Sequence, residues 1–452
     1  MKIIIVGDGK VGITLTEFLS QEGHDIMVID RSRKVIDNVV NNFDIMGISG
    51  NGANYDVLME AGAEKADLLI AATSSDELNI LSCLMAKKIG TKNTIARVRN
   101  PEYAQQLRFI REELGLSMVV NPEFEAARDI SRILRFPSAI ALECFSKGRV
   151  ELAEIKLPEN GYLAGRRLSE LYKICKEKVL ICAVQRGEEV FIPDGNFVLL
   201  AGDKIHVTGS HGALAAFFKS IDMFKEKSKN VLIIGGGKIA YYLAHHLAES
   251  HVDVKIIEQD EERCMHLSEV LPKATIICGD GTDQATLQEE GLVDCDACVA
   301  LTGIDEENII VSLYAQSLGV DKIVAKIDRL SFVDMMEGFG LDSFISPKTI
   351  TANRIVRYVR AMQDSGDSDM KTLYKIVNKQ VEALEFGVLE ETFYTDVPFK
   401  NLQIKSGMLF AAIIRHGHVI IPGGNDHLEV GDSVIIVTNA IGYVKNLEDV
   451  FA

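Results

Sequence analysis

The chain contains 452 residues, of which 48 are Lys or Arg and 65 are Asp or Glu, so its formal net charge at pH 7 is −17. With 47% hydrophobic and 25% charged residues, it has the composition of a globular protein of about three or four domains, which excludes a disordered, collagen-like or disulfide-stapled chain. No apolar run approaches the ~18 residues that span a bilayer, and the acidic balance argues against nucleic acid as a partner. The chain opens with an apolar run and no basic leader, so we expect a soluble, cytoplasmic protein.

The first predicted elements are a buried strand at 3–6, a glycine-rich loop and a helix at 10–21. A G-x-G-x-x-G loop between a strand and a helix is typical of a dinucleotide site. Its first glycine permits a tight turn, the second lets a diphosphate approach the backbone, and the third lets helix and strand pack closely. Free N–H groups and the helix dipole attract phosphate oxygens. The predicted binding residues of this loop are Gly7, Asp8, Gly9, Lys10, Val11 and Gly12.

The second predicted strand, at 26–29, ends at an acidic residue, Asp30. A carboxylate at this position accepts hydrogen bonds from the ribose hydroxyls of an adenosine group and repels the 2′-phosphate of NADP. Arg31 and Arg33 follow closely, and basic residues there would accommodate that phosphate. The pattern favours an NAD-type ligand and leaves an NADP-type ligand open.

Four more apolar strands, at 45–48, 68–72, 94–96 and 118–120, alternate with helical stretches. Apolar strands separated by helices predict a parallel sheet covered on both faces, that is, a Rossmann-like, doubly wound α/β domain over residues 1–135. Ligands of such domains bind at the carboxyl ends of the strands. Polar and cationic residues that follow these strands are further binding candidates: Asn51, Thr73, Ser74 and Arg97.

From about residue 136 the pattern changes to alternating strands and turns, which predicts a small α+β module over 136–222. The whole arrangement then repeats. Gly7 and Gly235 are 228 residues apart, as are Asp30 and Glu258, and the offset is 229 for the segments 72–79 and 301–308. Duplication therefore predicts a second Rossmann-like domain over 229–362 and a second small module over 370–452. A polar linker at 225–229 and an exposed acidic loop at 364–369 are expected between these parts.

The second copy supplies its own set of predicted binding residues. They are Gly235, Gly236, Gly237, Lys238, Ile239, Ala240, Glu258, Asp280, Thr302 and Lys326. Two positions differ between the copies: Ala240 replaces the third glycine, and Asp280 stands where the first copy has Asn51. These differences predict that the two sites are not equivalent. A degenerate glycine turn that binds nothing is the alternative for each loop.

No catalytic residues or metal ligands can be assigned from the sequence. The histidines are scattered, and no G-x-S-x-G, H-E-x-x-H or Walker A pattern occurs. The Cys295-x-x-Cys298 spacing lacks a second pair, so we interpret these cysteines as structural. A second nucleotide domain stands where an enzyme would carry its substrate domain. An NAD-dependent oxidoreductase of unknown substrate is the second hypothesis. A redox-sensing transcription factor would need a basic helix-turn-helix, and the sequence has neither that motif nor an unassigned domain that could contain it.

The glycine loops, Asp30 and Glu258, the segment 72–79 and the small modules together resemble the RCK/KTN regulators of potassium transport, in a tandem arrangement over essentially the whole chain. This resemblance implies a cytoplasmic, non-enzymatic protein that binds NAD(H) and adenine nucleotides such as ATP or ADP. It also implies a homotetrameric ring at the inner face of the membrane, beneath a potassium-translocating subunit of the TrkH/TrkG type. The helices around 122–135 and 347–362 would carry nucleotide-driven motion to neighbouring lobes.

Overall fold

The computed structural model describes residues 1–104, 106–329, 332–341, 343–363, 370–377, 380–439, 444 and 446–452, so the loop expected at 364–369 lies outside the described residues. The chain divides into two compact units. Unit 1 contains residues 1–134 and 228–356, and unit 2 contains residues 135–227 and 357–452. Each unit therefore combines corresponding parts of the two sequence halves.

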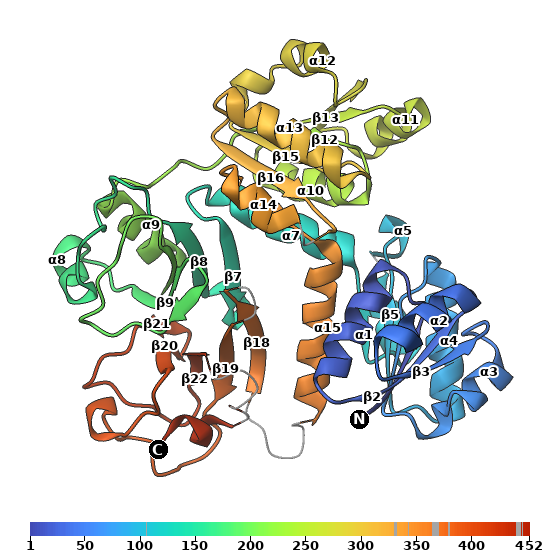
Figure 1. Ribbon diagram of the computed structural model, residues 1–452, viewed down its shortest axis with the longest axis horizontal. Helices are drawn as coiled ribbons and strands as arrows, with labels where there is room; N and C mark the ends of the chain where they lie inside the picture. The colour runs from blue at the N-terminus through green and yellow to red at the C-terminus, as the bar shows by residue number, and fades with distance from the viewer. Residues whose placement is uncertain are drawn as a thin grey trace. The chain divides into compact units, whose positions relative to one another are not determined.

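Unit 1 contains two six-stranded parallel sheets, and the part of the chain that contains each sheet is called here a lobe (Figure 1). The strand order of the first lobe is β3-β2-β1-β4-β5-β6, and that of the second is β14-β13-β12-β15-β16-β17. In both sheets the strand order switches to the other side of the first strand, between β1 and β4 or between β12 and β15. This switch point is where doubly wound sheets bind ligands. The predicted Rossmann-like fold is confirmed for both halves.

The elements of the first lobe follow the predicted alternation. Its strands are β1 (Lys2–Val6), β2 (Asp25–Asp30), β3 (Met46–Ser49), β4 (Leu68–Ala71), β5 (Asn93–Arg97) and β6 (Met118–Val120). Its helices are α1 (Lys10–Gln21), α2 (Arg33–Asn42), α3 (Tyr55–Glu60), α4 (Asp76–Ile89), α5 (Pro101–Ala104), α6 (Leu107–Glu113) and α7 (Pro122–Arg135).

The second lobe repeats this plan. Its strands are β12 (Asn230–Ile234), β13 (Asp253–Glu258), β14 (Ala274–Cys278), β15 (Ala297–Ala300), β16 (Lys322–Lys326) and β17 (Phe344–Ile345). Its helices are α10 (Lys238–Glu249), α11 (Glu261–Val270), α12 (Gln284–Glu289), α13 (Asp305–Ser317), α14 (Val333–Gly338) and α15 (Pro347–Gln363). No helix among the described residues is long and apolar enough to cross a membrane.

Helix α7 joins the two lobes of unit 1. Its apolar face, including Ala126, Ile130 and Leu134, belongs to the same buried core as α10, β12 and β13 of the second lobe. At its start, the side-chain amide of Asn121 donates a hydrogen bond to the Tyr242 hydroxyl at 2.9 Å, and that hydroxyl donates to the backbone carbonyl of Arg99 at 3.0 Å. The first lobe is thus attached to the second by a helix that packs away from its own sheet.

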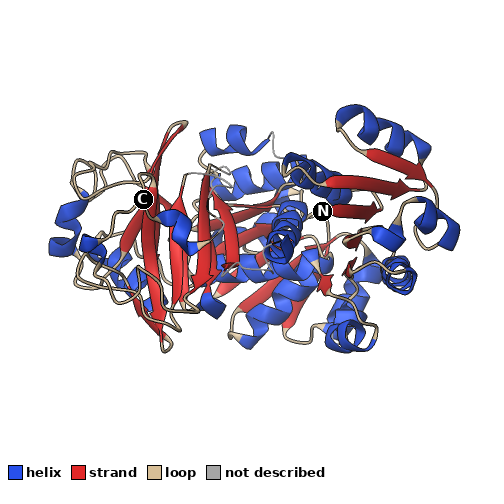
Figure 2. Cartoon of the chain, turned by 90° about the horizontal axis from the view of Figure 1, so that it is seen from below, coloured by secondary structure: helices blue, strands red, loops and turns tan. Residues whose placement is uncertain are grey.

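Unit 2 contains two small, mainly antiparallel sheets with the same topology. In the first the order is β7-β8-β11-β9-β10, and in the second it is β18-β19-β22-β20-β21. The first has strands β7 (Ala141–Phe145), β8 (Val150–Lys156), β9 (Leu180–Arg186), β10 (Glu189–Phe191) and β11 (Lys204–Gly209), with helices α8 (Leu171–Ile174) and α9 (His211–Ser220). The second has β18 (Met370–Ile376), β19 (Val381–Gly387), β20 (Met408–Arg415), β21 (His418–Ile420) and β22 (Ser433–Thr438). Figure 2 shows strands predominating here, whereas helices cover the parallel sheets.

The two small modules share a buried core. Phe145 and Leu152 of the first pack in one cluster with Val381 and Ile435 of the second. A buried carboxylate, that of Glu385, accepts a hydrogen bond from the hydroxyl of Ser146 at 2.6 Å. The predicted α+β modules therefore pair within one chain.

Candidate functional site

Both glycine loops have the geometry that a phosphate-binding turn requires. Gly7 has φ +87° and Gly235 has φ +97°, a region that favours glycine. A Cβ atom on Gly9 or Gly237 would meet no atom within 4 Å, so both middle glycines border open space. Each loop therefore leaves room beside the N-terminus of its helix, α1 or α10, where N–H groups attract an anion.

The two loops differ at their third position. A Cβ atom on Gly12 would lie 2.2 Å from the backbone oxygen of Gly7, so the first loop tolerates only glycine there without a shift. Ala240 occupies the corresponding position and is fully buried. The second loop therefore accommodates one more methyl group between helix and strand.

Each loop is closed by the acid at the end of the second strand. The Asp30 carboxylate accepts hydrogen bonds from the amides of Asp8, at 2.9 Å, and Ser32, at 2.8 Å. Glu258 likewise accepts one from the amide of Gly236, at 2.7 Å. Both carboxylates are only partly buried and retain acceptor capacity, which is what recognition of a ribose diol requires.

A cavity of about 700 Å³ in unit 1 collects many of the predicted residues. Those that line it are Gly7, Gly9, Lys10, Val11, Asp30, Thr73, Ser74 and Arg97 from the first lobe, and Gly237, Lys238, Ile239 and Lys326 from the second. The predicted residues that do not line it are Asp8, Gly12, Asn51, Gly235, Gly236, Ala240, Glu258, Asp280 and Thr302. The first-lobe cleft and the glycine loop of the second lobe thus border one space.

The lining of this cavity is strongly cationic although the chain is acidic. Seven Lys and Arg side chains contribute to it, against three carboxylates. The cations are Lys10, Arg31, Arg97, Arg99, Lys238, Lys326 and Lys348, and the acids are Asp30, Glu123 and Asp328. Concentrated positive charge of this kind attracts an anionic ligand.

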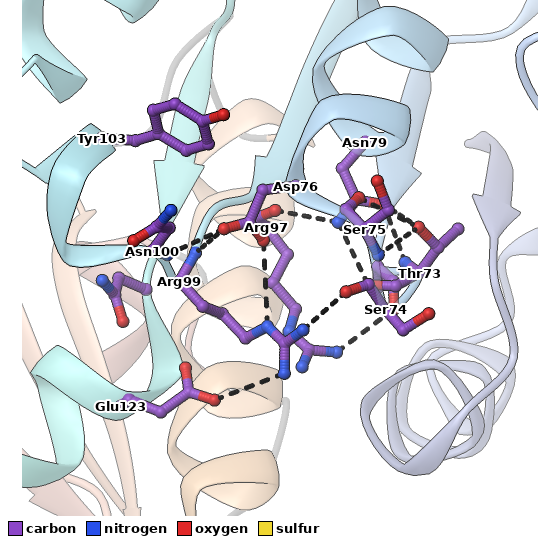
Figure 3. A network of polar contacts seen from close by, with 12 residues as sticks. Thr73, Ser74, Ser75, Asp76, Asn79, Arg97, Arg99, Asn100, Tyr103 and Glu123 are labelled. Carbon is purple, nitrogen blue, oxygen red and sulfur yellow. Dashed lines mark hydrogen bonds and ion pairs between the residues drawn. The ribbon is translucent and has the colours of Figure 1, made fainter. Parts of the chain in front are cut away.

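A polar network follows β4 and β5 of the first lobe (Figure 3). The buried Asn79 side chain accepts hydrogen bonds from the amide and hydroxyl of Thr73, at 2.8 and 2.7 Å, and donates to the backbone oxygen of Arg97 at 2.8 Å. The Asp76 carboxylate accepts hydrogen bonds from the amides of Arg99 and Asn100, at 2.8 and 2.7 Å. Asn79 and Asp76 therefore fix the backbone that presents the two arginines.

The second lobe builds the same network from the corresponding residues. Asn308 accepts a hydrogen bond from the Thr302 amide at 2.8 Å and donates to the backbone oxygen of Lys326 at 2.9 Å. Asp305 accepts hydrogen bonds from the amides of Asp328 and Arg329. The prediction from sequence did not include the buried Asp and Asn of either segment, although their recurrence in the repeat was the signal that pointed to them.

Burial tunes the charges that face the cavity. Burial, and then the neighbouring Arg99, lower the pKa of Arg97, whose Nε atom has no hydrogen-bond partner among the described residues. Burial raises the pKa of the Glu123 carboxyl, which lies 3.8 Å from Arg99. An anion placed against Arg97 would therefore supply a negative charge that stabilises the protonated guanidinium.

Several of the predicted binding residues have partners within the protein. Lys10 forms an ion pair with Asp328 of the second lobe at 2.7 Å, which raises the pKa of this lysine. Asn51 and Asp280 accept hydrogen bonds within their own turns, from the amides of Ala53 and Thr282 respectively. Thr73 and Thr302 likewise donate their amides to the asparagines described above.

No group of three or more His, Cys, Asp or Glu side chains that could hold a metal ion occurs among the residues described. Cys298 is fully buried in β15, and Cys295 donates its thiol hydrogen to the backbone oxygen of Leu292 at 3.0 Å. These contacts agree with a structural role for both cysteines.

Comparisons with known proteins identify the family. The TrkA-N domain model matches residues 3–122 and 231–347, and the TrkA-C domain model matches residues 152–222. A Trk system potassium uptake protein TrkA homolog of Archaeoglobus fulgidus is 32% identical over the full length of both chains. The Trk system potassium uptake protein TrkA of Halomonas elongata is 32% identical over 100% of this chain and 98% of its own length.

Solved structures agree on the fold. The GsuK channel bound to NAD is 19% identical, with a TM-score of 0.63, and the match covers 97% of this chain and 77% of that one. The duplicated glycine loops, the paired small modules and the full-length relatives lead to one conclusion: this chain belongs to the TrkA family of Trk system potassium uptake proteins.

Proposed function

We propose that this chain is a nucleotide-sensing regulatory subunit that binds NAD(H), ADP or ATP in the cavity of unit 1 and thereby gates a membrane-embedded potassium-translocating subunit of the TrkH/TrkG type. The observation that carries this proposal is the cationic lining of the cavity in a chain of net charge −17. The two open glycine loops and the carboxylate of Asp30 add the elements that a phosphate and a ribose need. The proposed ligand-binding residues of the cavity are the sequence-predicted residues that line it, with Arg99 and Lys348 added, and the second glycine loop with Glu258 is proposed as a second site.

Each part of an adenine nucleotide would have its own partner residues in the cavity. Asp30 would accept hydrogen bonds from the ribose hydroxyls, and the loop around Gly9 would receive the first phosphate. Arg97 and Arg99, held in place by Asn79 and Asp76, would neutralise the charge of the phosphate tail. The NAD-bound GsuK channel, which shares the fold, supports the same class of ligand here.

Gating requires that the nucleotide bind two arrangements of the protein with different affinity. A tenfold difference in affinity corresponds to about 1.4 kcal/mol per site, enough to bias an assembly of several chains. We propose a homotetrameric ring at the cytoplasmic face of the membrane, with α7 and α15 as the elements that move. Helix α7 supports this role because its core residues pack on the second lobe while its first turn follows the first-lobe sheet.

Potassium flux into liposomes tests the proposal. Vesicles that contain a Trk-type translocating subunit are assayed with and without this full-length chain, across a titration of NADH and ADP. We expect the nucleotide to change the flux only when the chain is present. We also expect Asp30→Ala, but not Asp37→Ala at an exposed position of α2, to shift the nucleotide dependence to higher concentration.

Two results would refute this function. One is a potassium flux that changes neither when the chain is added nor when the nucleotide is titrated. The other is sustained oxidation of NADH by the chain with a metabolite, measured by absorbance, which would favour the oxidoreductase hypothesis.

A further inference from the structure

Two cysteines of the second lobe lie together beside its predicted ribose site. The Cys264 thiol, on α11, donates a hydrogen bond to the backbone oxygen of Glu258 at 3.2 Å and lies 4.0 Å from the backbone oxygen of Ile277. Ile277 directly precedes Cys278, the last residue of the edge strand β14. Burial, and next the neighbouring Cys278 thiol, raise the pKa of Cys264 to about 11.

The two thiols differ in access to solvent. Cys264 is buried and Cys278 is exposed. The exposed thiol can reach a small disulfide in solution, whereas its buried neighbour is shielded from solvent and can react only with the sulfur beside it. An accessible cysteine next to a resolving cysteine is the arrangement typical of redox-sensitive pairs.

Glu258 connects the thiol pair to the second glycine loop. Its backbone oxygen accepts the Cys264 thiol hydrogen, while its carboxylate accepts hydrogen bonds from the amides of Gly236 and Asp260, at 2.7 and 2.9 Å. In the parallel pairing of β13 with β14, Glu258 is also the register partner of Cys278. A bond between the two sulfurs would therefore act directly on the residue that closes the second glycine loop.

The fold does not require these cysteines. At the corresponding positions of the first lobe stand Ile36, on α2, and Ser49, at the end of β3. Ile36 is buried, as Cys264 is, so a hydrophobic side chain serves the same packing position. The dithiol is a property of the second lobe alone.

We propose that Cys264 and Cys278 form an oxidisable dithiol site that closes to a disulfide by exchange with a small disulfide and thereby weakens nucleotide binding at the second glycine loop. The effect on binding rests on the function proposed above, whereas formation of the disulfide does not.

The exchange balances without any other reactant. The Cys278 thiolate attacks one sulfur of the small disulfide, and the first thiolate leaves and takes up a proton. The Cys264 sulfur, having lost its proton, then attacks Sγ of Cys278, and the second thiol leaves. The protein loses two protons and two electrons, and the small disulfide takes them up to become two thiols.

Peptide mapping of the full chain tests the site itself. The protein is incubated with 2-hydroxyethyl disulfide, the remaining thiols are blocked with iodoacetamide, and the digest is analysed by mass spectrometry. We expect a cross-linked pair of peptides that contain Cys264 and Cys278, with the combined mass reduced by two hydrogens. Alkylation of both residues, or a mixed disulfide on Cys278 that never resolves, would overturn the proposal.

The first lobe supplies matched variants. Cys264→Ile and Cys278→Ser introduce the residues of the equivalent positions and should each abolish the cross-link while the protein stays folded, as checked by circular dichroism. Cys295→Ser is the control, because this cysteine hydrogen-bonds within its own turn, and it should leave the cross-link intact. A cross-link that persists in Cys278→Ser would contradict the assignment.

Nucleotide titration of oxidised and reduced protein tests the consequence. To isolate the second loop, the titration uses the Asp30→Ala background, with ADP as the probe. We expect oxidation to weaken this remaining binding about fivefold or more, and reduction with dithiothreitol to restore it. Equal affinity in both states would overturn the regulatory part, whereas no binding in either state, with the cross-link present, would refute the proposed function but not the dithiol site.

Discussion

The carboxylate of Asp30 accepts a hydrogen bond from the backbone amide of Asp8 at 2.9 Å. The residue that ends the second strand therefore fixes the conformation of the glycine loop and at the same time faces the cavity. Because one residue serves both purposes, the proposed binding of a ribose and of a phosphate would be coupled through a single side chain.

Replacing this acid tests that coupling. We expect Asp30→Ala to weaken the binding of NADH and ADP to the first lobe by about tenfold to a hundredfold, since hydrogen bonds to a charged group contribute about 1.5–3 kcal/mol. Fluorescence titration with NADH, with ADP as competitor, measures the change. Asp37→Ala removes an exposed acid of the same lobe and should have no effect, so equal losses in both variants would count against the assignment.

The partly buried guanidinium of Arg97 tests the phosphate end of the site. Arg97→Gln should weaken binding of ADP by about tenfold and binding of AMP less, because the lost charge faces the phosphate tail. Equilibrium dialysis with both nucleotides gives the comparison. Lys92→Gln is the control, because Lys92 is paired with Asp67 at the surface, outside the cavity, and an identical loss for AMP and ADP would show that Arg97 does not contact the tail.

The buried asparagine behind each cation tests the role of the repeated network. Asn79→Ala leaves the Thr73 amide and the Arg97 carbonyl without their partner, which should cost about 2–4 kcal/mol of stability in the first lobe. Urea denaturation, with hydrogen exchange assigning the loss to that lobe, measures it. Asn42→Ala, at an exposed position of α2, should change stability by less than about 0.5 kcal/mol.

Asp8 makes the stability of the first lobe depend on pH. Burial, only partly offset by the hydrogen bond from Thr16, raises the pKa of this carboxyl from 3.8 to about 6. The folded state therefore holds the proton more tightly than the unfolded state, and the stability this gives is present below about pH 4 and lost as the pH rises through about 6. Asp8→Asn should stabilise the lobe by about 1–2 kcal/mol at pH 7.5, with the difference vanishing below about pH 4 in thermal melts. A constant difference across this range would contradict the assignment.

His206, in the first small module, gives the opposite sign. Burial lowers its pKa from 6.5 to about 3, so the folded module holds the neutral ring, and its stability is complete above about pH 6.5 and declines as the pH falls toward 3. His206→Ile introduces the residue found at the equivalent position, Ile435, of the second module. Between pH 6.5 and 5 the variant should lose about 2 kcal/mol less stability than the wild type. Hydrogen exchange of the β11 amides measures this difference in stability. If the stability of the wild type and of the variant changed with pH in the same way, a buried neutral histidine would be contradicted.

Much of the fold follows from local pattern. The predicted helix at 10–21 is α1 (Lys10–Gln21), and the helix expected around 122–135 is α7 (Pro122–Arg135). Glycine spacing and apolar runs determine these elements because they act over a few residues. The four domains with boundaries at 135, 222 and 362 stay predictions. The structure divides into two compact units, and each unit contains one segment from each half of the chain.

Contacts between the lobes could not be predicted from the sequence, because they join residues that are far apart in the chain. Lys10 was expected to face a phosphate, but Asp328, more than 300 positions later, forms an ion pair with it. Likewise, nothing local to Glu258 predicts that the second phosphate loop borders the first-lobe cavity while the second acid does not. Such relationships depend on how α7 packs across the lobes.

The most direct test is a crystal structure of the full chain grown with ADP. The account predicts the ribose hydroxyls on the Asp30 carboxylate, a phosphate in the Gly7–Gly12 loop and the guanidinium of Arg97 within hydrogen-bond distance of a phosphate oxygen. An empty cleft in crystals grown at saturating ADP, or ADP bound away from both glycine loops, would contradict it.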